Sequence, residues 1–168
     1  MSKEAINSCP VTINILNNIP GLISASVSIL EPGARINPHY GDTDAIIRCH
    51  LGLKIPAGLP SCGFRVGYED RSWEQGKLLM FNDAAYHKAW NETDQTRIVL
   101  LFDIIRIQHE KQKKWICSKV RGSILYQYLL NQFGIKPSRN YFSKVCSMVF
   151  AAYYFLLFTV FLKSALLK

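Results

Sequence analysis

The chain has 168 residues, 49% of them hydrophobic, which is enough for one domain with a real core. Its five cysteines are odd in number and none has CxxC spacing, which argues against a disulfide framework or a zinc site and favours a reducing compartment. The net charge of +8 is unevenly divided, because residues 1–103 carry nine Lys/Arg against eleven Asp/Glu, while residues 104–168 carry eleven against Glu110 alone.

Segments with the composition and alternation of β-strands fill the first hundred residues. The turn sequences PAGLPS, EDRSWEQG and NETDQ lie between them, and EPGARINP gives a turn and a short extended stretch. Short strands at this spacing predict an all-β sandwich or barrel with a site inside it. The expected strands are Leu22–Leu30, Ala45–Ile55, Cys62–Tyr68, Lys77–Asn82, Tyr86–Trp90 and Thr96–Ile105.

Two features of these strands place polar side chains in the predicted interior. Arg48 and His50 are two residues apart on an alternating strand, so both are expected to face the same pocket. The short loop Asn91–Gln95 is expected to join two antiparallel strands as a hairpin, which would bring Arg97 onto the wall near His87.

The basic part of the chain predicts a linker followed by a membrane segment. Residues 107–144 begin with the charged connector QHEKQKKW and continue with an amphipathic helix over Ser123–Phe133 that ends at Gly134 and Pro137. Val145–Leu162 then runs for eighteen uncharged residues between two lysines, which is near the lower limit for a transmembrane helix. A buried helix of a soluble protein and a helix lying in the membrane interface are the alternatives.

Charge and the N-terminus predict where the first domain lies. Five Lys/Arg between residues 119 and 144 precede the apolar segment and two lysines follow it, which places the N-terminal domain on the cytoplasmic side of a single-pass C-terminal anchor. Residues 1–10 show no signal peptide. We expect the basic linker to meet anionic lipid headgroups, and we expect no nucleic-acid partner.

Five motifs follow one another in the predicted β-domain: PHYG, RCHLGLKIP, WEQGKLLMF, D-x-x-x-H-x-x-W and RIVLLFD. Their order and spacing resemble the aspartyl/asparaginyl β-hydroxylase family of Fe(II)/2-oxoglutarate dioxygenases. The resemblance covers Leu22 to Ile105. It implies a double-stranded β-helix, also called a jelly roll or cupin-like fold, which we assign to residues 1–106. Composition and charge assign residues 107–144 as the linker and residues 145–162 as the transmembrane helix.

The resemblance also implies a set of site residues. His39 and His87 look like catalytic iron ligands, and Arg97 looks like the residue that binds the distal carboxylate of 2-oxoglutarate, with Ser28, Arg48 and His50 as further cosubstrate contacts. Side-chain chemistry agrees, because neutral imidazoles suit Fe(II) and leave positions for a bidentate cosubstrate and O2, while the planar guanidinium suits a carboxylate.

Some of these residues have a second interpretation. His50 could be a hydrogen-bond donor behind the site, and Arg48 could be a cross-strand ion-pair partner. Trp73 and Trp90 are expected to pack in the core or at the rim rather than to form a substrate cage.

The chain departs from the wider enzyme class at one position. Most 2-oxoglutarate dioxygenases have a carboxylate two residues after the first histidine, where this chain has Gly41. The branch that hydroxylates protein side chains resembles this chain in having glycine there, whereas the membrane-bound branch that hydroxylates lipid A has aspartate. We expect water, rather than Asp42 or Asp44, in the third coordination position of the iron.

The chain also departs from the family at its start. Only twenty-one residues precede Leu22, fewer than in family catalytic domains.

These observations predict a hydroxylase that uses Fe(II), 2-oxoglutarate and O2. The expected acceptor is the β-carbon of aspartyl or asparaginyl residues in a protein or peptide. Two alternatives stay open: hydroxylation of a lipid A acyl chain at the membrane, or a catalytically silent binding module of the same fold.

Overall fold

The computed structural model describes residues 8–132, 149 and 152–153. The chain forms two compact units, Met1–Glu110 and Lys111–Lys168. The described part of the first unit opens with helix α2 (Pro10–Asn17) and continues with eight strands. These are β1 (Leu22–Leu30), β2 (Arg35–His39), β3 (Ile46–Lys54), β4 (Cys62–Val66), β5 (Glu69–Arg71), β6 (Leu78–Asn82), β7 (His87–Asn91) and β8 (Arg97–Ile105).

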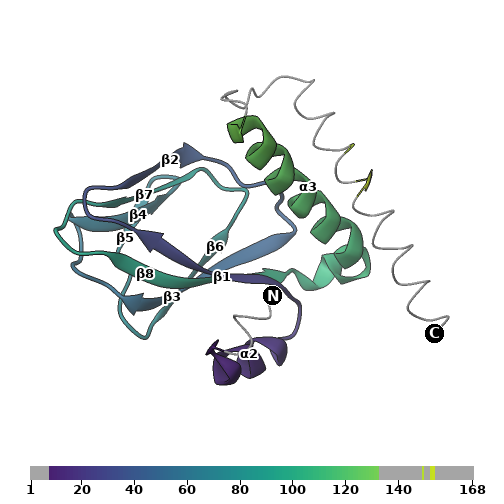
Figure 1. Cartoon of the computed structure of the whole chain (residues 1–168), viewed down its shortest axis with the longest axis horizontal. Coiled ribbons are helices and arrows are strands. Elements are labelled where there is room, and N and C mark those ends of the chain that lie inside the picture. Colours follow the sequence, from purple (N-terminus) through teal and green to yellow (C-terminus); the bar gives the residue numbers. More distant parts are fainter. Residues whose placement is uncertain (1–7, 133–148, 150–151, 154–168) are drawn as a thin grey trace. The chain divides into compact units, whose positions relative to one another are not determined.

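The strands form two antiparallel four-stranded sheets that face each other (Figure 1). Their order is β1-β8-β3-β6 in one sheet and β2-β7-β4-β5 in the other. Successive strands therefore alternate between the sheets except at the β4–β5 turn, which is the winding of a jelly roll. The predicted double-stranded β-helix is confirmed for this unit.

The strands predicted from alternation are all present, and β1 has the predicted bounds. Strand β5 and helix α2 were not predicted, and β2 was expected only as a short extended stretch within EPGARINP. β2 contains a proline and has only one residue that is not exposed, and β5 consists of three exposed charged residues, so neither has an alternating pattern. Helix α2 lacks a polar N-cap hydrogen bond and begins with a proline, so its start gives a weak signal.

The predicted hairpin at Asn91–Gln95 is wrong. β7 pairs with β2 and β4 in one sheet, and β8 pairs with β1 and β3 in the other, so both edges of each strand are already taken. The loop instead crosses from one sheet to the other. Since the sheets face each other, this crossing still brings Arg97 to the interior opposite β7.

Apolar residues lie on both sides of the β1–β8–β3–β6 sheet. Between the sheets, Phe64, Trp73 and Phe81 pack with smaller side chains. On the outer face, Leu16 of α2 packs on Cys49 and Phe102. The interior of the sandwich is thus partly aromatic, and the polar site is inserted into it.

After β8, a 3-10 helix over Ile107–Gln112 is followed by helix α3 (Lys113–Gln132). The predicted connector QHEKQKKW is therefore helical, and α3 begins ten residues before the predicted helix. No helix among residues 8–132 is long and apolar enough to cross a membrane. The predicted membrane segment Val145–Leu162, apart from residues 149, 152 and 153, lies outside the described residues, as does the end of the predicted linker.

Candidate active site

A pocket of about 100 Å³ lies between the two sheets and is lined by every residue that the sequence nominated for the site. β2 and β7 supply His39 and His87 from one sheet, and β1, β3 and β8 supply the remaining four residues from the other. The six residues are Ser28, His39, Arg48, His50, His87 and Arg97.

His39 and His87 form a close pair. They lie directly opposite each other in the β2–β7 ladder, and their ring centroids are 4.2 Å apart with an interplanar angle of 57°. Cross-strand partners share a face of the sheet, so the strand register itself brings the two imidazoles together. His87 is buried, and burial is the main cause that lowers its pKa, with the charges of His39 and Arg48 acting in the same direction.

Backbone carbonyls fix the orientation of both rings. Nδ1 of His39 lies 2.8 Å from the carbonyl oxygen of Asn37, and Nδ1 of His87 lies 2.7 Å from that of Ala85. A carbonyl only accepts hydrogen bonds, so each Nδ1 carries the proton and each Nε2 keeps its lone pair. Histidine metal ligands are usually held in this way by a partner on the other ring nitrogen.

Arg97 is a buried cation without a counter-ion among the described residues. Its side chain is 1% exposed, and its Nη1 donates to the carbonyl oxygen and the hydroxyl of Ser28, each at 3.2 Å. The guanidinium carbon lies 4.5 Å from the centre of the Trp73 ring, a cation–π contact. Burial lowers the pKa of Arg97 to about 10, so it stays charged at neutral pH. Its Nε has no hydrogen-bond partner within the part of the chain that the structure describes.

His50 presents a second unpaired donor to the same pocket. The indole N–H of Trp73 donates to Nδ1 of His50 at 3.1 Å, so the proton of the neutral ring is on Nε2. That Nε2 is buried and has no partner among the described residues. Burial, with the charges of Arg97, Arg48 and His87, lowers the pKa of His50 to about 3, which keeps the ring neutral.

The depressed pKa of His50 predicts acid sensitivity. Its pKa falls from 6.5 to about 3 on folding. The contribution of the neutral ring to the free energy of unfolding is therefore fully present above pH 6.5 and is lost as the pH falls towards 3. We expect His50 alone to cost about 3 kcal/mol of unfolding free energy between about pH 7 and about pH 4. Urea unfolding of wild type and His50→Gln at both pH values checks this, and His109→Gln, outside the pocket, is the control. Equal acid sensitivity of wild type and His50→Gln would contradict it.

Arg48 is held by two carboxylates. Its Nε and Nη2 donate to Asp103 at 2.9 and 3.1 Å, and its Nη1 lies 2.5 Å from Oδ1 of Asp83. The Asp83 contact is an ion pair without good hydrogen-bond alignment, so that buried oxygen still lacks a donor. Burial alone would lower the pKa of Arg48, but the hydrogen bonds and charge of Asp103 and the charge of Asp83 raise it. The cross-strand ion pair considered from sequence is thus present, and Arg48 also lines the pocket.

Gly41 is explained by Asp83. The backbone N–H of Gly41 donates to the carbonyl oxygen of Asp83 at 2.9 Å, and a Cβ at position 41 would overlap the Asp83 carboxylate. Asp42 and Asp44 are exposed and are not among the residues that line the pocket. Within residues 8–132, no third His, Cys, Asp or Glu joins the histidine pair in a cluster suited to a metal ion.

A side chain at position 41 should destabilise the fold. In Gly41→Ala the new Cβ would meet the Asp83 side chain and lie 2.5 Å from its carbonyl oxygen, so the strand ends must move apart. Overpacking of this kind costs about 1–3 kcal/mol. Urea unfolding measures the loss, and Gly58→Ala, whose Cβ would meet only Ser72 Oγ at 3.7 Å, is the matched control. Equal stability of the two variants would show that the site accommodates a side chain easily.

Three positioning residues were not assigned from sequence. Trp73 is buried and contacts both Arg97 and His50, while Asp103 and Asp83 hold Arg48. Each belongs to a motif quoted above, so the signal was present, but their roles depend on contacts between strands far apart in sequence. Trp73 packs in the core, as expected.

The donors in this pocket fit a metal ion and a dicarboxylate. Two neutral histidines with free Nε2 lone pairs suit a first-row metal such as Fe(II). A buried guanidinium without a carboxylate partner, beside an unpaired imidazole N–H, suits an anionic oxygen ligand. Fold and site together define a small jelly-roll protein with a candidate site for a metal ion and an anion between its two sheets.

The chain belongs to the aspartyl/asparaginyl β-hydroxylase family, whose sequence profile matches residues 1–107. It is 41% identical over 105 residues to the ornithine lipid ester-linked acyl 2-hydroxylase of Rhizobium tropici, covering 62% of this chain and 37% of that protein. It is 32% identical over 108 residues to the human aspartyl/asparaginyl beta-hydroxylase, covering 61% of this chain and 14% of that protein. The chain thus matches little more than a third of the length of the first relative and a seventh of the second.

Among solved structures, a non-heme monooxygenase in its nickel complex is similar with a TM-score of 0.44 and 16% sequence identity, over 61% of this chain and 52% of that one. At this level the likeness carries no argument about activity.

Proposed function

We propose that this chain is an Fe(II)/2-oxoglutarate-dependent hydroxylase. One observation carries the proposal: a single pocket holds two facing histidines and a buried arginine, and among the described residues no carboxylate pairs with that arginine and no partner binds Nε2 of either histidine. Membership of the family supports it. Iron bound with 2-oxoglutarate and O2 would supply the oxidising chemistry that hydroxylates a C–H bond.

Each of the six nominated pocket residues has a defined part in this proposal. His39 and His87 would hold Fe(II) through Nε2, with the carbonyl groups of Asn37 and Ala85 fixing the rings. Arg97, oriented by Ser28 and stacked on Trp73, would bind the distal carboxylate of 2-oxoglutarate.

The other pocket residues would complete the site around the cosubstrate. His50 would donate its free Nε2–H to an oxygen of the cosubstrate. Arg48, fixed between Asp83 and Asp103, would keep positive charge at the pocket wall.

Two acceptor classes remain within this proposal. Gly41 and the resemblance to protein-modifying enzymes favour an aspartyl or asparaginyl side chain. A specific observation favours a lipid acyl chain as the second candidate, namely the 41% identity to an enzyme named for hydroxylating an ester-linked acyl group. A catalytically silent module of the same fold is the third outcome that an experiment must separate.

Anaerobic titration with Fe(II) and then 2-oxoglutarate tests the proposal. We expect a charge-transfer absorption band that appears only when both are present and saturates at one equivalent of each. Metal analysis of the purified full-length protein accompanies the titration. Iron that binds without the band would leave a metal-binding module, and failure to bind iron would overturn the proposal.

The membrane attachment predicted from sequence gives a separate expectation. The full-length chain should stay in the membrane fraction after a high-salt wash, because salt screens the attraction between basic residues and headgroups but not the insertion of an apolar segment. Fractionation with an alkaline wash as a second step measures this. Release by salt alone would mean that residues 145–162 do not insert.

A further inference from the structure

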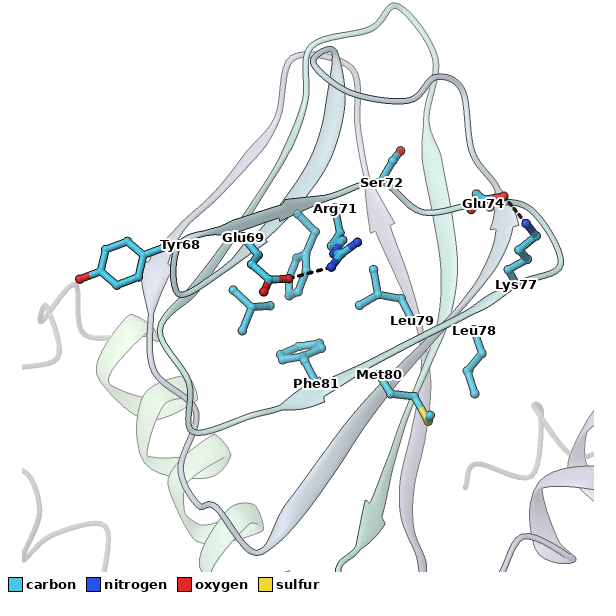
Figure 2. A pocket seen from close by; sticks show the side chains of 12 residues that line it. Tyr68, Glu69, Arg71, Ser72, Glu74, Lys77, Leu78, Leu79, Met80 and Phe81 are labelled. Atoms are coloured by element: carbon cyan, nitrogen blue, oxygen red, sulfur yellow. Dashed lines mark hydrogen bonds and ion pairs between the residues drawn. The ribbon is translucent and has the colours of Figure 1, made fainter.

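A second and larger cavity opens beside the candidate site. It is a groove of about 650 Å³ between the edge strands β5 and β6, where the two sheets are not joined. Figure 2 shows Glu69 and Arg71 on one side of the open space and Leu79 and Phe81 on the other, with Leu78 and Met80 pointing to the opposite side of β6. Its volume falls in the range of small-molecule sites, about 300–1,000 Å³.

The charged residues of the groove neutralise one another. Nη2 of Arg71 lies 2.8 Å from Oε2 of Glu69, and Nζ of Lys77 lies 2.5 Å from Oε2 of Glu74, as the dashed lines in Figure 2 show. Of the groove residues, these four carry the charge, and they sum to zero. The remaining lining is mostly apolar, so the groove offers no free cation to a carboxylate or phosphate and suits an uncharged apolar ligand.

The groove ends at the wall of the candidate site. Phe64 and Phe81 line both the groove and the smaller pocket, and their rings are 4.7 Å apart. On the other side the same rings contact His87, with centroid distances of 5.8 Å from Phe64 and 5.1 Å from Phe81. A ligand in the groove therefore reaches two aromatic rings that touch one of the proposed metal ligands.

We propose that this groove binds the alkyl chain of the acceptor, with the chain lying over Leu79 and Phe81 and ending at the Phe64–Phe81 pair. Such a chain is uncharged, which matches the paired rim, and apolar, which matches the lining and the wall shared with the site. Its assignment to an acceptor rests on the proposed hydroxylase function, whereas the binding itself does not. A lipid acyl chain is the acceptor class that carries such a group.

Neutral alcohols test the binding without using the arginine site. Hexanol, decanol and tetradecanol are titrated into the full-length protein in the absence of iron and 2-oxoglutarate. Binding is read from the 13C-labelled methyl signal of Met80, one of three methionines in the chain, assigned with Met80→Leu. We expect Met80 to shift and the affinity to rise by up to about fourfold for each added methylene that is buried.

Two aspartate variants localise the effect. Leu79 points into the groove, while Leu53 does not line it. Leu79→Asp should weaken the binding of tetradecanol at least about tenfold, because the chain would then meet an unpaired carboxylate, and Leu53→Asp should leave that binding unchanged. Equal weakening by both variants, or a Met80 signal that no alcohol moves, would overturn the proposal.

Other occupants would give different results. β6 is an uncharged edge strand, so an extended peptide could add to it, and a shift of Met80 with an asparagine-containing peptide but not with alcohols would replace the alkyl chain by a peptide. A shift that depends on protein concentration alone would assign the groove to a second copy. If the protein binds alcohols but shows no charge-transfer band with iron and 2-oxoglutarate, the groove binds alkyl chains and the proposed hydroxylase function is wrong.

Discussion

Replacement of either histidine should abolish iron-dependent turnover of 2-oxoglutarate. Within residues 8–132 no carboxylate, thiol or third histidine joins the pair in a metal-binding cluster, so His39→Ala or His87→Ala leaves a single protein ligand. Mutation of a residue that only orients a metal ligand lowers metal affinity or activity by about 10–100-fold. Loss of a ligand itself should therefore lower turnover by more than about 100-fold. Succinate formation and bound iron are both measured.

The controls separate loss of iron from loss of fold. His87 is 4% exposed, so its removal leaves a small cavity, and thermal unfolding of each variant must be recorded. His109 belongs to the 3-10 helix after β8 and does not line the pocket, so His109→Ala should keep full turnover. A folded His39→Ala or His87→Ala protein that retains near wild-type turnover would remove that residue from the proposed metal site.

Alternation along the chain was sufficient to predict most of the fold. The central strands β3 and β8 are buried or half-buried on both faces over most of their length, because one face lies on the aromatic interior and the other on apolar side chains outside. β2 and β5 are edge strands with exposed or charged residues, and their strand conformation comes from pairing with β7 and β4. Local sequence does not encode such pairing.

The strand partners of β7 and β8 show why the wrong hairpin did not harm the site prediction. A five-residue loop fits a hairpin, and the pairing of both strands with other neighbours decides otherwise. In either topology Arg97 would lie close to His87, so the expected position was reached for the wrong reason. The motifs predicted which residues gather in the pocket, but not that Asp83 would fill the space beside Gly41.

The environment of the site residues depends on contacts that periodicity cannot supply. Arg48 and His50 face one pocket, as their spacing predicts, yet their partners differ completely. Arg48 is compensated by Asp83 and Asp103, from the end of β6 and from β8, whereas His50 accepts only the Trp73 N–H and keeps a free donor. The cosubstrate role of His50 is therefore better supported by its surroundings than that of Arg48, and both remain predictions.

Arg97→Lys should weaken the binding of 2-oxoglutarate far more than it weakens the binding of iron. A lysine keeps the positive charge near Ser28 but loses the planar fork that can bind both oxygens of a carboxylate and stack on Trp73. Loss of one charged hydrogen bond costs about 1.5–3 kcal/mol, which corresponds to a rise of about 10- to 100-fold in the apparent Michaelis constant for 2-oxoglutarate.

The measurement compares the Michaelis constant for 2-oxoglutarate with the dissociation constant for Fe(II) in the same variant. Iron affinity should change by less than about threefold, because Arg97 lies on the sheet opposite the histidine pair and its side chain is held by Ser28 and Trp73. Arg65 is a half-buried arginine of β4, in the sheet that does not contain Arg97, and it is paired with Asp70 of the neighbouring strand β5. Arg65→Lys is therefore the control and should change neither constant. If Arg97→Lys weakens iron and 2-oxoglutarate equally, then Arg97 supports the fold of the pocket, and the buried cation must be explained without a dicarboxylate.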